Sequence, residues 1–575
     1  MFTLDTCVAK ATPSTLSDGI TGQAVNLNVV PEDIHHLIMT EVAGTSPTDV
    51  LNVAHSSVTL RDAALPFIYR NVTLTRGLKK SEELKRYQAL VENFRGDEQG
   101  HIAKHVRSIT VTNDVPSDDL IMMLNKVAQH GDLESLNWET SAHMSRAVYD
   151  MIHATWPQLE LRVVTLDRQN AKNILHRQMD MKLLSSPLLT ELTYVVYTQG
   201  YRPDKPCRSD WPRISQALAV GGNVRSLRLQ NRQDFDGYHE ARIVPDSEPE
   251  RLPRLDLASG LRMPRLEELT IEVSRIFGDS TYLWDDDCCR MFLDSIDCSR
   301  LRKLDFGIDN PTNFFKSFAG LCPKLKTLSF GMLGRNDIDL SARIFIESLD
   351  TLEHLDVSHP QHSIDDLWPA IEKHRDSLKT LILGPTFGHY YHSKYMGLSL
   401  LETIASTFPN LERLGWQAEC DTNASFSHLI VHICADCTSQ IDARHLEVLS
   451  SMKLTKLDLY LHIPGKATDY CDQLMGGMMG AATTPPLDEK RSVAAAVEIA
   501  EAVSGSQKDG LQWLTLHISR MTYGDRADPW EVFTRLQIRQ NSYSNRVRRH
   551  KWDVRGKMDW YALPSLEENL LLEEE

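Results

Sequence analysis

The chain has 575 residues, of which 42% are hydrophobic and 24% are charged, as in an ordinary folded protein. Its length exceeds what one hydrophobic core supports, so we expect several domains or an extended repeat array. The formal net charge of −16 disfavours a nucleic-acid or anionic-membrane surface, since both kinds of partner require a basic face.

The N-terminal segment and the cysteine content indicate in which cellular compartment the protein is expected. Residues 1–25 lack the basic start and the apolar segment of a signal peptide, and we expect them to be disordered. The ten cysteines are too sparse and irregular for a disulfide scaffold, which indicates reduced thiols in a cytoplasmic or nuclear protein. No apolar run is long enough to span a bilayer.

A compact apolar unit is predicted over residues 26–75. The segment "VPED" at 30–33 places a proline in the first turn of a helix and acidic residues at its positive end. The histidines at 35–36 fall off the apolar stripe of this helix and are expected to face water. The stripe itself recurs at helical spacing and consists of Ile34, Leu37, Ile38 and Val42.

A second apolar face follows the chain break "GTSPT" at 44–48. It consists of Val50, Leu51, Val53, Ala54 and Leu60. The run "LPFIYRNVTL" at 65–74 then predicts a short turn and a strand that leads into the next part of the chain.

The opening Val-Pro-Glu-Asp-Ile at 30–34 and the stretch "DVLNVAHSSVTLRDAA" at 49–64 resemble the F-box, a short three-helix unit that binds Skp1. Leu60 departs from the tryptophan that many members carry there. An alternative is that the helices only cap the open core of the first repeat. The resemblance implies Skp1 contacts by Val30, Pro31, Ile34, Leu37, Ile38, Val42, Val50, Leu51, Ala54 and Leu60.

Residues 76–105 are expected to form a helical connector, and residues 106–520 a repeat array. The pattern apolar-x-x-apolar-x-apolar occurs thirteen times, and helix-like segments such as "LIMMLNKVAQH" (120–130) precede many copies. A regular alternation of strands and helices predicts parallel strands that are joined by helical crossover connections. The copies begin at residues 106, 133, 161, 189, 224, 266, 301, 325, 352, 378, 411, 454 and 511.

This array resembles the leucine-rich repeat family, which implies a solenoid with strands on a concave face and helices on a convex face. Repeat lengths vary and the usual Asn or Cys after the strand is irregular, so we expect an irregular horseshoe with excursions near 231–263, 418–453 and 461–510. The predicted fold class is α/β, with an N-terminal three-helix F-box and a leucine-rich-repeat solenoid. A set of ordinary α/β domains is the alternative.

Residues between the apolar strand positions are expected on the concave face, because side chains alternate along a strand. Their mixed charges favour a protein or peptide target. The alternative is a solvated face, with the target bound by the long loops. The predicted target-binding residues are Arg228, Lys303, Asp305, His354, Asp356, Arg413, Lys456, Asp458 and Tyr460.

One group of cysteines and histidines has zinc-ligand chemistry. It lacks a second pair at finger-like spacing, and "HLIVHICADC" (428–437) also fits an apolar helix, so we predict no metal and no other cofactor. Common nucleotide, zinc-protease and serine-hydrolase motifs are absent from the sequence, so we predict no catalytic residue and no enzyme. The group consists of Cys420, His428, His432, Cys434, Cys437 and His445.

Residues 521–575 are expected to form a C-terminal cap and an acidic tail. Within them, apolar residues interrupt the basic run "NRVRRHKWDVRGK" (545–557), which favours a strand pair over a nuclear-import signal.

The two resemblances imply a substrate-recognition adaptor of a Skp1–cullin–F-box ubiquitin ligase. Such a subunit binds Skp1, and through it a cullin, with the F-box, and it holds a protein target with the repeats. It would have no nucleic-acid or membrane partner. The alternative function is a leucine-rich-repeat scaffold whose N-terminal helices only cap the solenoid.

Overall fold

The computed structural model divides into two compact units, Met1–Pro264 (unit 1) and Arg265–Glu575 (unit 2). Each is described by itself. The described residues are 30–45, 47–76, 81–112, 115–165, 168, 177–199, 208–234, 254–257, 260–273, 284–307, 311–331, 340–358, 364–384, 397–418, 420–421, 440–441, 443–463, 499–500, 502–504, 511–523, 529–540 and 552–557.

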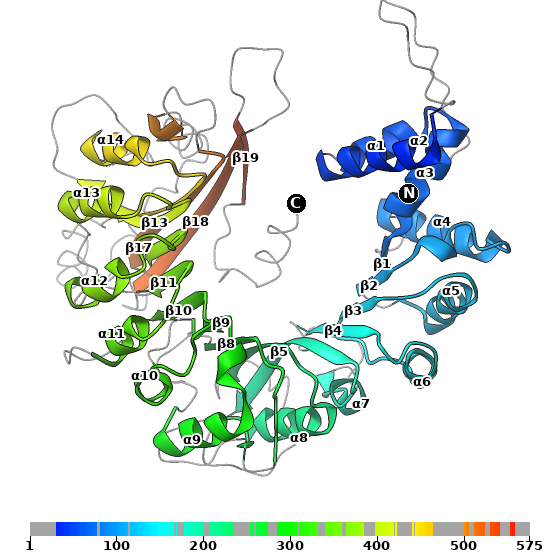
Figure 1. The fold of residues 1–575 in the computed structure, drawn as a ribbon, viewed down its shortest axis with the longest axis horizontal. Coiled ribbons are helices and arrows are strands. Elements are labelled where there is room, and N and C mark those ends of the chain that lie inside the picture. Colours follow the sequence, from blue (N-terminus) through cyan, green and yellow to red (C-terminus); the bar gives the residue numbers. More distant parts are fainter. Residues whose placement is uncertain are drawn as a thin grey trace, which may run out of the picture. The chain divides into compact units, whose positions relative to one another are not determined.

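Three helices open unit 1: α1 (Glu32–Thr45), α2 (Pro47–Ala54) and α3 (Val58–Tyr69) (Figure 1). The side chain of Ser57 caps α3 by accepting a hydrogen bond from the amide of Leu60 at 3.2 Å. The helices share a small core of their own, made up of Met39, Val50, Ala54, Leu60 and Ala64.

The inward face of α1 differs from the predicted stripe. His35 is buried, with 2% of its surface exposed, so the prediction that both histidines face water is wrong for this residue. His36 is exposed, and its ring lies 5.1 Å from the ring of Phe67. Residues 35, 39 and 42 recur at helical spacing and point inward. Val42 belongs to the predicted stripe, whereas Ile34 and Leu37 of that stripe are exposed.

Unit 1 continues as a sheet with helices along one face (Figure 1). Strands β1, β2, β3, β4, β5 and β7 pair in parallel, and the short β6 pairs antiparallel with β5. The elements are β1 (Asn71–Thr75), α4 (Glu82–Gly96), the 3₁₀ helix η2 (Ala103–His105), β2 (Ser108–Thr112), α5 (Ser117–His130), β3 (Ser135–Glu139), α6 (Arg146–Thr155), β4 (Glu160–Thr165), α7 (Met181–Leu184), β5 (Leu189–Gln199), β6 (Arg208–Ser209), α8 (Trp211–Gly221) and β7 (Ser226–Asp234).

Unit 2 repeats the same alternation. Strands β8 to β13, β16 and β17 pair in parallel in chain order, and β18 and β19 extend the sheet antiparallel. The elements are β8 (Glu268–Val273), α9 (Asp286–Ser295), the 3₁₀ helix η5 (Cys298–Arg300), β9 (Lys303–Asp305), α10 (Thr312–Phe318), β10 (Thr327–Gly331), α11 (Leu340–Glu347), β11 (His354–Ser358), α12 (Ile364–Glu372), β12 (Thr380–Gly384), α13 (Leu398–Thr407), β13 (Arg413–Ala418), β14 (Cys420–Asp421), β15 (Gln440–Ile441), α14 (Ala443–Ser451), β16 (Lys456–Ile463), β17 (Trp513–Tyr523), β18 (Pro529–Gln540) and β19 (Trp552–Lys557).

The predicted fold class is confirmed: N-terminal helices precede alternating strands and helices of the leucine-rich-repeat kind. The strand interpretation of the basic run 545–557 holds for β19, which pairs with β18. Residues 1–29, which include the segment expected to be disordered, lie outside the described residues, as do 558–575 and most of the three predicted excursions.

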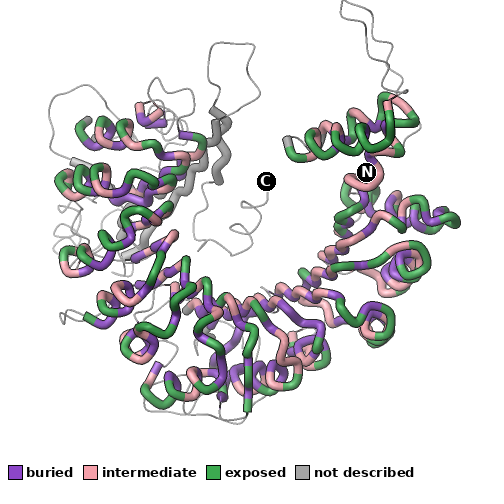
Figure 2. The backbone as a smooth tube through the Cα atoms, viewed as in Figure 1, coloured by how far each residue is buried: buried purple, intermediate pink, exposed green. Residues whose placement is uncertain are grey.

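The apolar positions of the repeat pattern form the core (Figure 2). In twelve of the thirteen copies all three positions are buried; Leu352, Leu355 and Val357 of one copy have 0% exposure. The copy at 161 is the exception. There Leu161 and Val163 point inward and Val164 is only half-buried, because pairing with β3 aligns Leu136 with Leu161 and Trp138 with Val163. A one-residue slip moves every side chain to the opposite face of a sheet.

An ion pair is buried inside unit 1. Arg168 is 1% exposed and donates hydrogen bonds to the carboxylate of Asp210 and to the carbonyl of Val195 at 3.1 Å. Its guanidinium carbon lies 4.8 Å and 4.9 Å from the ring centres of Tyr194 and Tyr197. Separating the two buried charges would be strongly destabilising. Because Asp210 precedes α8 and the other contacts of Arg168 are on β5, the ion pair holds the start of α8 against β5.

We expect Leu355→Ala to lower the free energy of unfolding by about 2–5 kcal/mol, because it opens a cavity in the middle of the sheet of unit 2. The control is Leu340→Ala on α11, where the side chain is 53% exposed and the change should stay within about 0.5 kcal/mol. Urea unfolding followed by tryptophan fluorescence measures both. Equal losses in the two variants would contradict the assignment of the core.

Candidate functional site

The N-terminal helices expose an unusual amount of apolar surface. The described residues contain eight exposed large apolar side chains, and four of these are on α1, α2 and α3. Leu37 is 62% exposed and Val58 is 63% exposed, although both lie in or beside the apolar faces of their helices. Large exposed apolar side chains that gather on one small unit make it a candidate interaction surface. The four residues are Ile34, Leu37, Leu51 and Val58.

The structure divides the residues predicted to contact Skp1 into three groups, according to their burial. Val50, Ala54 and Leu60 are buried in the core of the three helices. Val30, Ile38 and Val42 are half-buried, and Val42 packs against that core. The exposed members are Pro31, Ile34, Leu37 and Leu51. Sequence reasoning missed Val58, which directly follows the capping Ser57 and starts α3 with its side chain outside.

The helical unit joins the first repeat through α3. Among the described elements, α3 contacts η2 and β1, whereas α1 and α2 pack mainly on each other and on α3. The carbonyl of Arg70, at the end of α3, accepts hydrogen bonds from the amides of Arg107 and Ser108, each at 2.9 Å. This attachment leaves the outer sides of α1 and α2 exposed.

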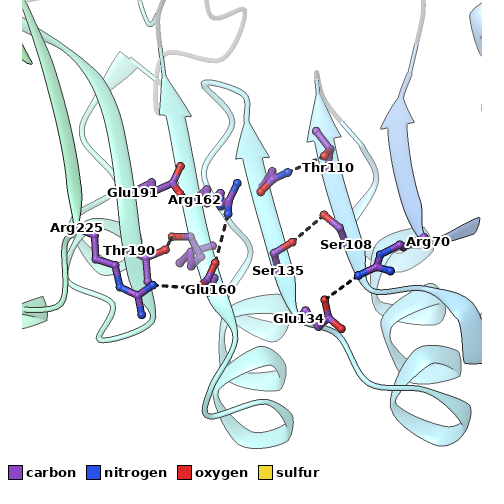
Figure 3. A network of polar contacts seen from close by, with 12 residues as sticks. Arg70, Ser108, Thr110, Glu134, Ser135, Glu160, Arg162, Thr190, Glu191 and Arg225 are labelled. Atoms are coloured by element: carbon purple, nitrogen blue, oxygen red, sulfur yellow. Dashed lines mark hydrogen bonds and ion pairs between the residues drawn. The ribbon is translucent and has the colours of Figure 1, made fainter. Parts of the chain in front are cut away.

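The second candidate surface is the strand face, meaning the face of each sheet opposite its helices. In unit 1 this face consists largely of polar side chains that bind one another (Figure 3). Ser135 Oγ donates to Ser108 Oγ at 2.8 Å, and Asn137 Nδ2 donates to Thr110 Oγ1 at 3.0 Å. Further along the sheet the contacts become ionic, with Arg162–Glu191 at 3.2 Å, Arg162–Glu160 at 3.3 Å and Arg225–Glu160 at 3.2 Å.

In unit 2 the strand register arranges outward side chains in two rows. Paired strands align Asp305 with Ser329 and Ser329 with Asp356, and the same row reaches Asp458 on β16. The neighbouring row contains two lysines, an arginine and a histidine, and no carboxylate. The first row consists of Lys303, Thr327, His354, Thr380, Arg413 and Lys456, and the second row of Asp305, Ser329, Asp356, Ile382, Gly415 and Asp458.

One ion pair links the two rows. Arg413 Nε donates to Asp458 Oδ2 at 2.7 Å, and Asp458 is 4% exposed. Burial alone would lower the pKa of Arg413, but the adjacent Asp458 carboxylate, together with Tyr460 and Asp356, outweighs burial and raises that pKa. The two residues therefore neutralise each other, and Lys303 and Lys456 carry the net positive charge of the first row.

Asp356 lies at the centre of the second row. Burial, together with the negative charges of Asp305 and Asp458, raises the pKa of Asp356 to about 7, and Arg413 opposes this shift. Nδ1 of the neighbouring His354 forms a hydrogen bond with Thr380 Oγ1 at 2.9 Å. Burial lowers the pKa of His354. The charge of this part of the strand face therefore changes near neutral pH.

The ring of Tyr460 lies across the sheet above Gly384, two strands away. A Cβ atom at Gly384 would stand 2.6 Å from a ring carbon of Tyr460, so any larger residue there would displace the Tyr460 ring. Gln417, aligned between the two strands, is 3% exposed. Sequence reasoning placed Tyr460 on this face but did not predict its contact with Gly384, which depends on the register of three strands.

The structure places the predicted target-binding residues on strand faces, as the alternation requires. Arg228 is half-buried on β7 of unit 1, and the other eight are on unit 2. Glu353 directly precedes His354 of the first row. Its carboxylate accepts hydrogen bonds from the side-chain ammonium groups of Lys326 and, at 2.9 Å, of Lys379. The bonds to Lys326 and Lys379 lower the pKa of Glu353 to about 2.

The described residues contain no group of three or more His, Cys, Asp or Glu side chains placed to hold a metal ion. The predicted cysteine and histidine group falls almost wholly outside them: His428, His432, Cys434 and Cys437 are not described, and only the backbone of Cys420 is, in β14. His445 is buried on α14. None of the described helices is long and apolar enough to cross a membrane.

No protein-family model matches the chain, and no curated protein matches it either. The repeat α/β architecture is that of a protein-interaction scaffold, with surfaces formed by successive strands.

Asp356→Asn should change the pH dependence of stability. The folded carboxyl keeps its proton up to a pKa of about 7, whereas the unfolded one releases it near 3.8, so wild-type stability falls as pH rises between these values. An asparagine side chain does not titrate, so the variant does not lose stability over this pH range. Urea unfolding should find it about 1–3 kcal/mol more stable than wild type at pH 8 and equal to wild type below pH 4.

Glu353→Gln is the matched control with the opposite sign. The lowered pKa of Glu353 contributes stability above pH 4.5 that is lost as pH falls toward 2, so this variant should lose at most about 1 kcal/mol at pH 7. If the two variants respond to pH in the same direction, the assignment of charges on this face is wrong.

Proposed function

We propose that the protein is a substrate-recognition adaptor of a Skp1–cullin–F-box ubiquitin ligase. The three N-terminal helices bind Skp1, and through it a cullin, while the strand faces of the repeats hold a protein target. The adaptor itself catalyses no step. It raises the local concentration of target lysines near the ubiquitin-conjugating enzyme, which is a proximity effect.

The observation that carries the proposal is the exposed apolar surface of the helical unit. Its core is complete without a partner, because Met39, Val50 and Ala64 are buried among the three helices. The side chains of Leu37 and Leu51 nevertheless remain 62% and 44% exposed. Covering the remaining exposed part of each such leucine would contribute about 1 kcal/mol to association, since full burial of a leucine contributes about 1.5–3 kcal/mol. Both are among the residues for which the F-box resemblance implies contact with Skp1.

The strand face of unit 2 supports a folded protein or peptide target. Its rows of opposite charge run side by side across successive strands, which suits a partner that carries both signs. Lys303 and Lys456 are half-buried and exposed, respectively, and face outward in the first row. The face of unit 1 is less suited, because its side chains already bond one another.

A scaffold whose N-terminal helices only cap the repeats is the second candidate. The packing of α3 on η2 and its continuation into β1 favour it, because a cap must cover the end of the core. This reading accounts for α3 but leaves the exposed leucines of α1 and α2 without a role. It predicts no Skp1 complex at all.

Leu37→Asp combined with Leu51→Asp should abolish co-purification with Skp1, reducing the recovered complex at least tenfold. Both side chains are exposed, so circular dichroism and the urea midpoint should stay at their wild-type values. Leu340→Asp combined with Ile344→Asp on α11 is the control, since these leucine and isoleucine side chains are similarly exposed in unit 2. Failure of the wild-type protein to bind Skp1 would favour the scaffold.

The target surface is tested in the same Leu37→Asp, Leu51→Asp background, in which undegraded targets should accumulate. Proximity labelling should then recover a set of proteins that is lost, at least fivefold, when Lys303→Glu and Lys456→Glu are added. Arg290→Glu on α9, where the side chain is 71% exposed, is the control for charge reversal on the helical side. If the Lys303→Glu, Lys456→Glu variant labels the same set of proteins, the target does not bind the strand face of unit 2.

A further inference from the structure

Two cysteines occupy the same position in consecutive repeats of unit 2. Cys298 begins η5 and Cys322 lies in the turn before β10, each three residues ahead of the first leucine of its repeat pattern. The local backbone is the same in both: the amide of Leu301 donates to the carbonyl of Cys298, and that of Leu325 to Cys322, each at 3.2 Å. The strands that follow are in register, with Lys303 aligned to Thr327.

This register brings the two sulfur atoms together. Neighbouring parallel strands lie about 4.8 Å apart, so equivalent positions fall inside the Cα separation of about 4.4–6.8 Å that a disulfide requires. The two thiols lie close enough for each to be the main influence on the pKa of the other. Both are buried, and Cys298 is the more accessible, with 8% of its surface exposed against 1% for Cys322.

The two thiols are chemically unequal. The contact with Cys322 lowers the pKa of Cys298, and the same contact raises the pKa of Cys322. By contrast, burial, together with the neighbouring Cys288, raises the pKa of Cys289 to about 12. Because Cys298 is the more exposed thiol of the pair and its contact with Cys322 favours the thiolate, which is the reactive form, Cys298 is the nucleophile and Cys322 the resolving thiol.

We propose that Cys298 and Cys322 are a reversible oxidation site at which hydrogen peroxide joins two consecutive repeats by a disulfide. The Cys298 thiolate attacks peroxide, forming an S–O bond and breaking the O–O bond, which yields a sulfenic acid and, after protonation, water. The sulfur of Cys322 then attacks Cys298, the S–S bond forms, and the hydroxyl leaves with the Cys322 proton as a second water. Two thiols lose two electrons in total, and peroxide gains them.

The disulfide would act on the strand face. It would fix the turns that lead into β9 and β10, the strands that present Asp305 and Ser329 in the second row. Closing this short loop restricts the unfolded chain and holds the two repeats together. The inference does not depend on the identity of the protein that binds this face.

The test treats the purified full-length protein with hydrogen peroxide and maps its tryptic peptides without reduction. Cleavage separates residues 291–300 from 317–324, each with one cysteine, so the disulfide appears as one joined species two hydrogens lighter than the pair. We expect most of both peptides to be joined at sub-millimolar peroxide, and dithiothreitol to release them. Cys289→Ala is the matched control and should leave the yield unchanged.

Two variants separate the roles of the thiols. Cys322→Ser should leave a Cys298 sulfenic acid that a dimedone probe labels, whereas Cys298→Ser should remove both the label and the joined species. Native mass spectrometry and the thermal midpoint check that each variant is folded. If wild-type protein accumulates a sulfenic acid without joining the peptides, or if Cys322 is oxidised in Cys298→Ser at the wild-type rate, the proposal is overturned.

Discussion

The structure depends on the in-register burial of leucines across parallel strands. Leu328, Leu355 and Leu381 align from β10 to β12, and all three have 0% exposure. No single repeat could bury such a side chain, because one face of each strand is covered only by its own helix and by the neighbouring repeats. Ordering each residue costs about 1–2 kcal/mol of backbone entropy, so stability must come from stacking. The register is therefore fixed wherever repeats meet, and a slip would expose the whole apolar set.

The surface chemistry follows from the same register. Once the leucines are aligned inward, the outward residues between them must align in rows, and the charge of each row is the sum of what the repeats contribute. This explains why a carboxylate as distant in sequence as Asp458 raises the pKa of Asp356. It also explains the contrast between the units. The hydroxyl and amide groups of unit 1 are matched strand by strand, as in Ser135 and Ser108, whereas unit 2 sets a basic row beside an acidic one.

The sequence predicted what the repeat dictates and missed what depends on pairing between particular strands. The apolar triads and the outward positions could be read from alternation alone. The slip at Leu161 could not, because Val163 and Val164 offer two apolar alternations and only pairing with β3 selects one. The burial of His35 depends on how α1 meets α2 and α3. The contact between Tyr460 and Gly384 joins residues two strands apart, so spacing within one repeat carries no signal for it. Cys298 and Cys322 share one position of the repeat pattern, but only the pairing of β9 with β10 brings these two positions side by side.

The N-terminal helices can be judged by the same rule of burial. A helical cap exists to cover an open core, and its outer side should be polar for that reason. Here α3 satisfies the first requirement, since it meets η2 and β1. The outer sides of α1 and α2 do not satisfy the second, since Ile34, Leu37 and Leu51 remain exposed around a core that is already filled by Met39 and its neighbours. Exposed leucines carry a solubility cost that folding of this unit does not require, and coverage by a binding partner is the physical circumstance that removes it.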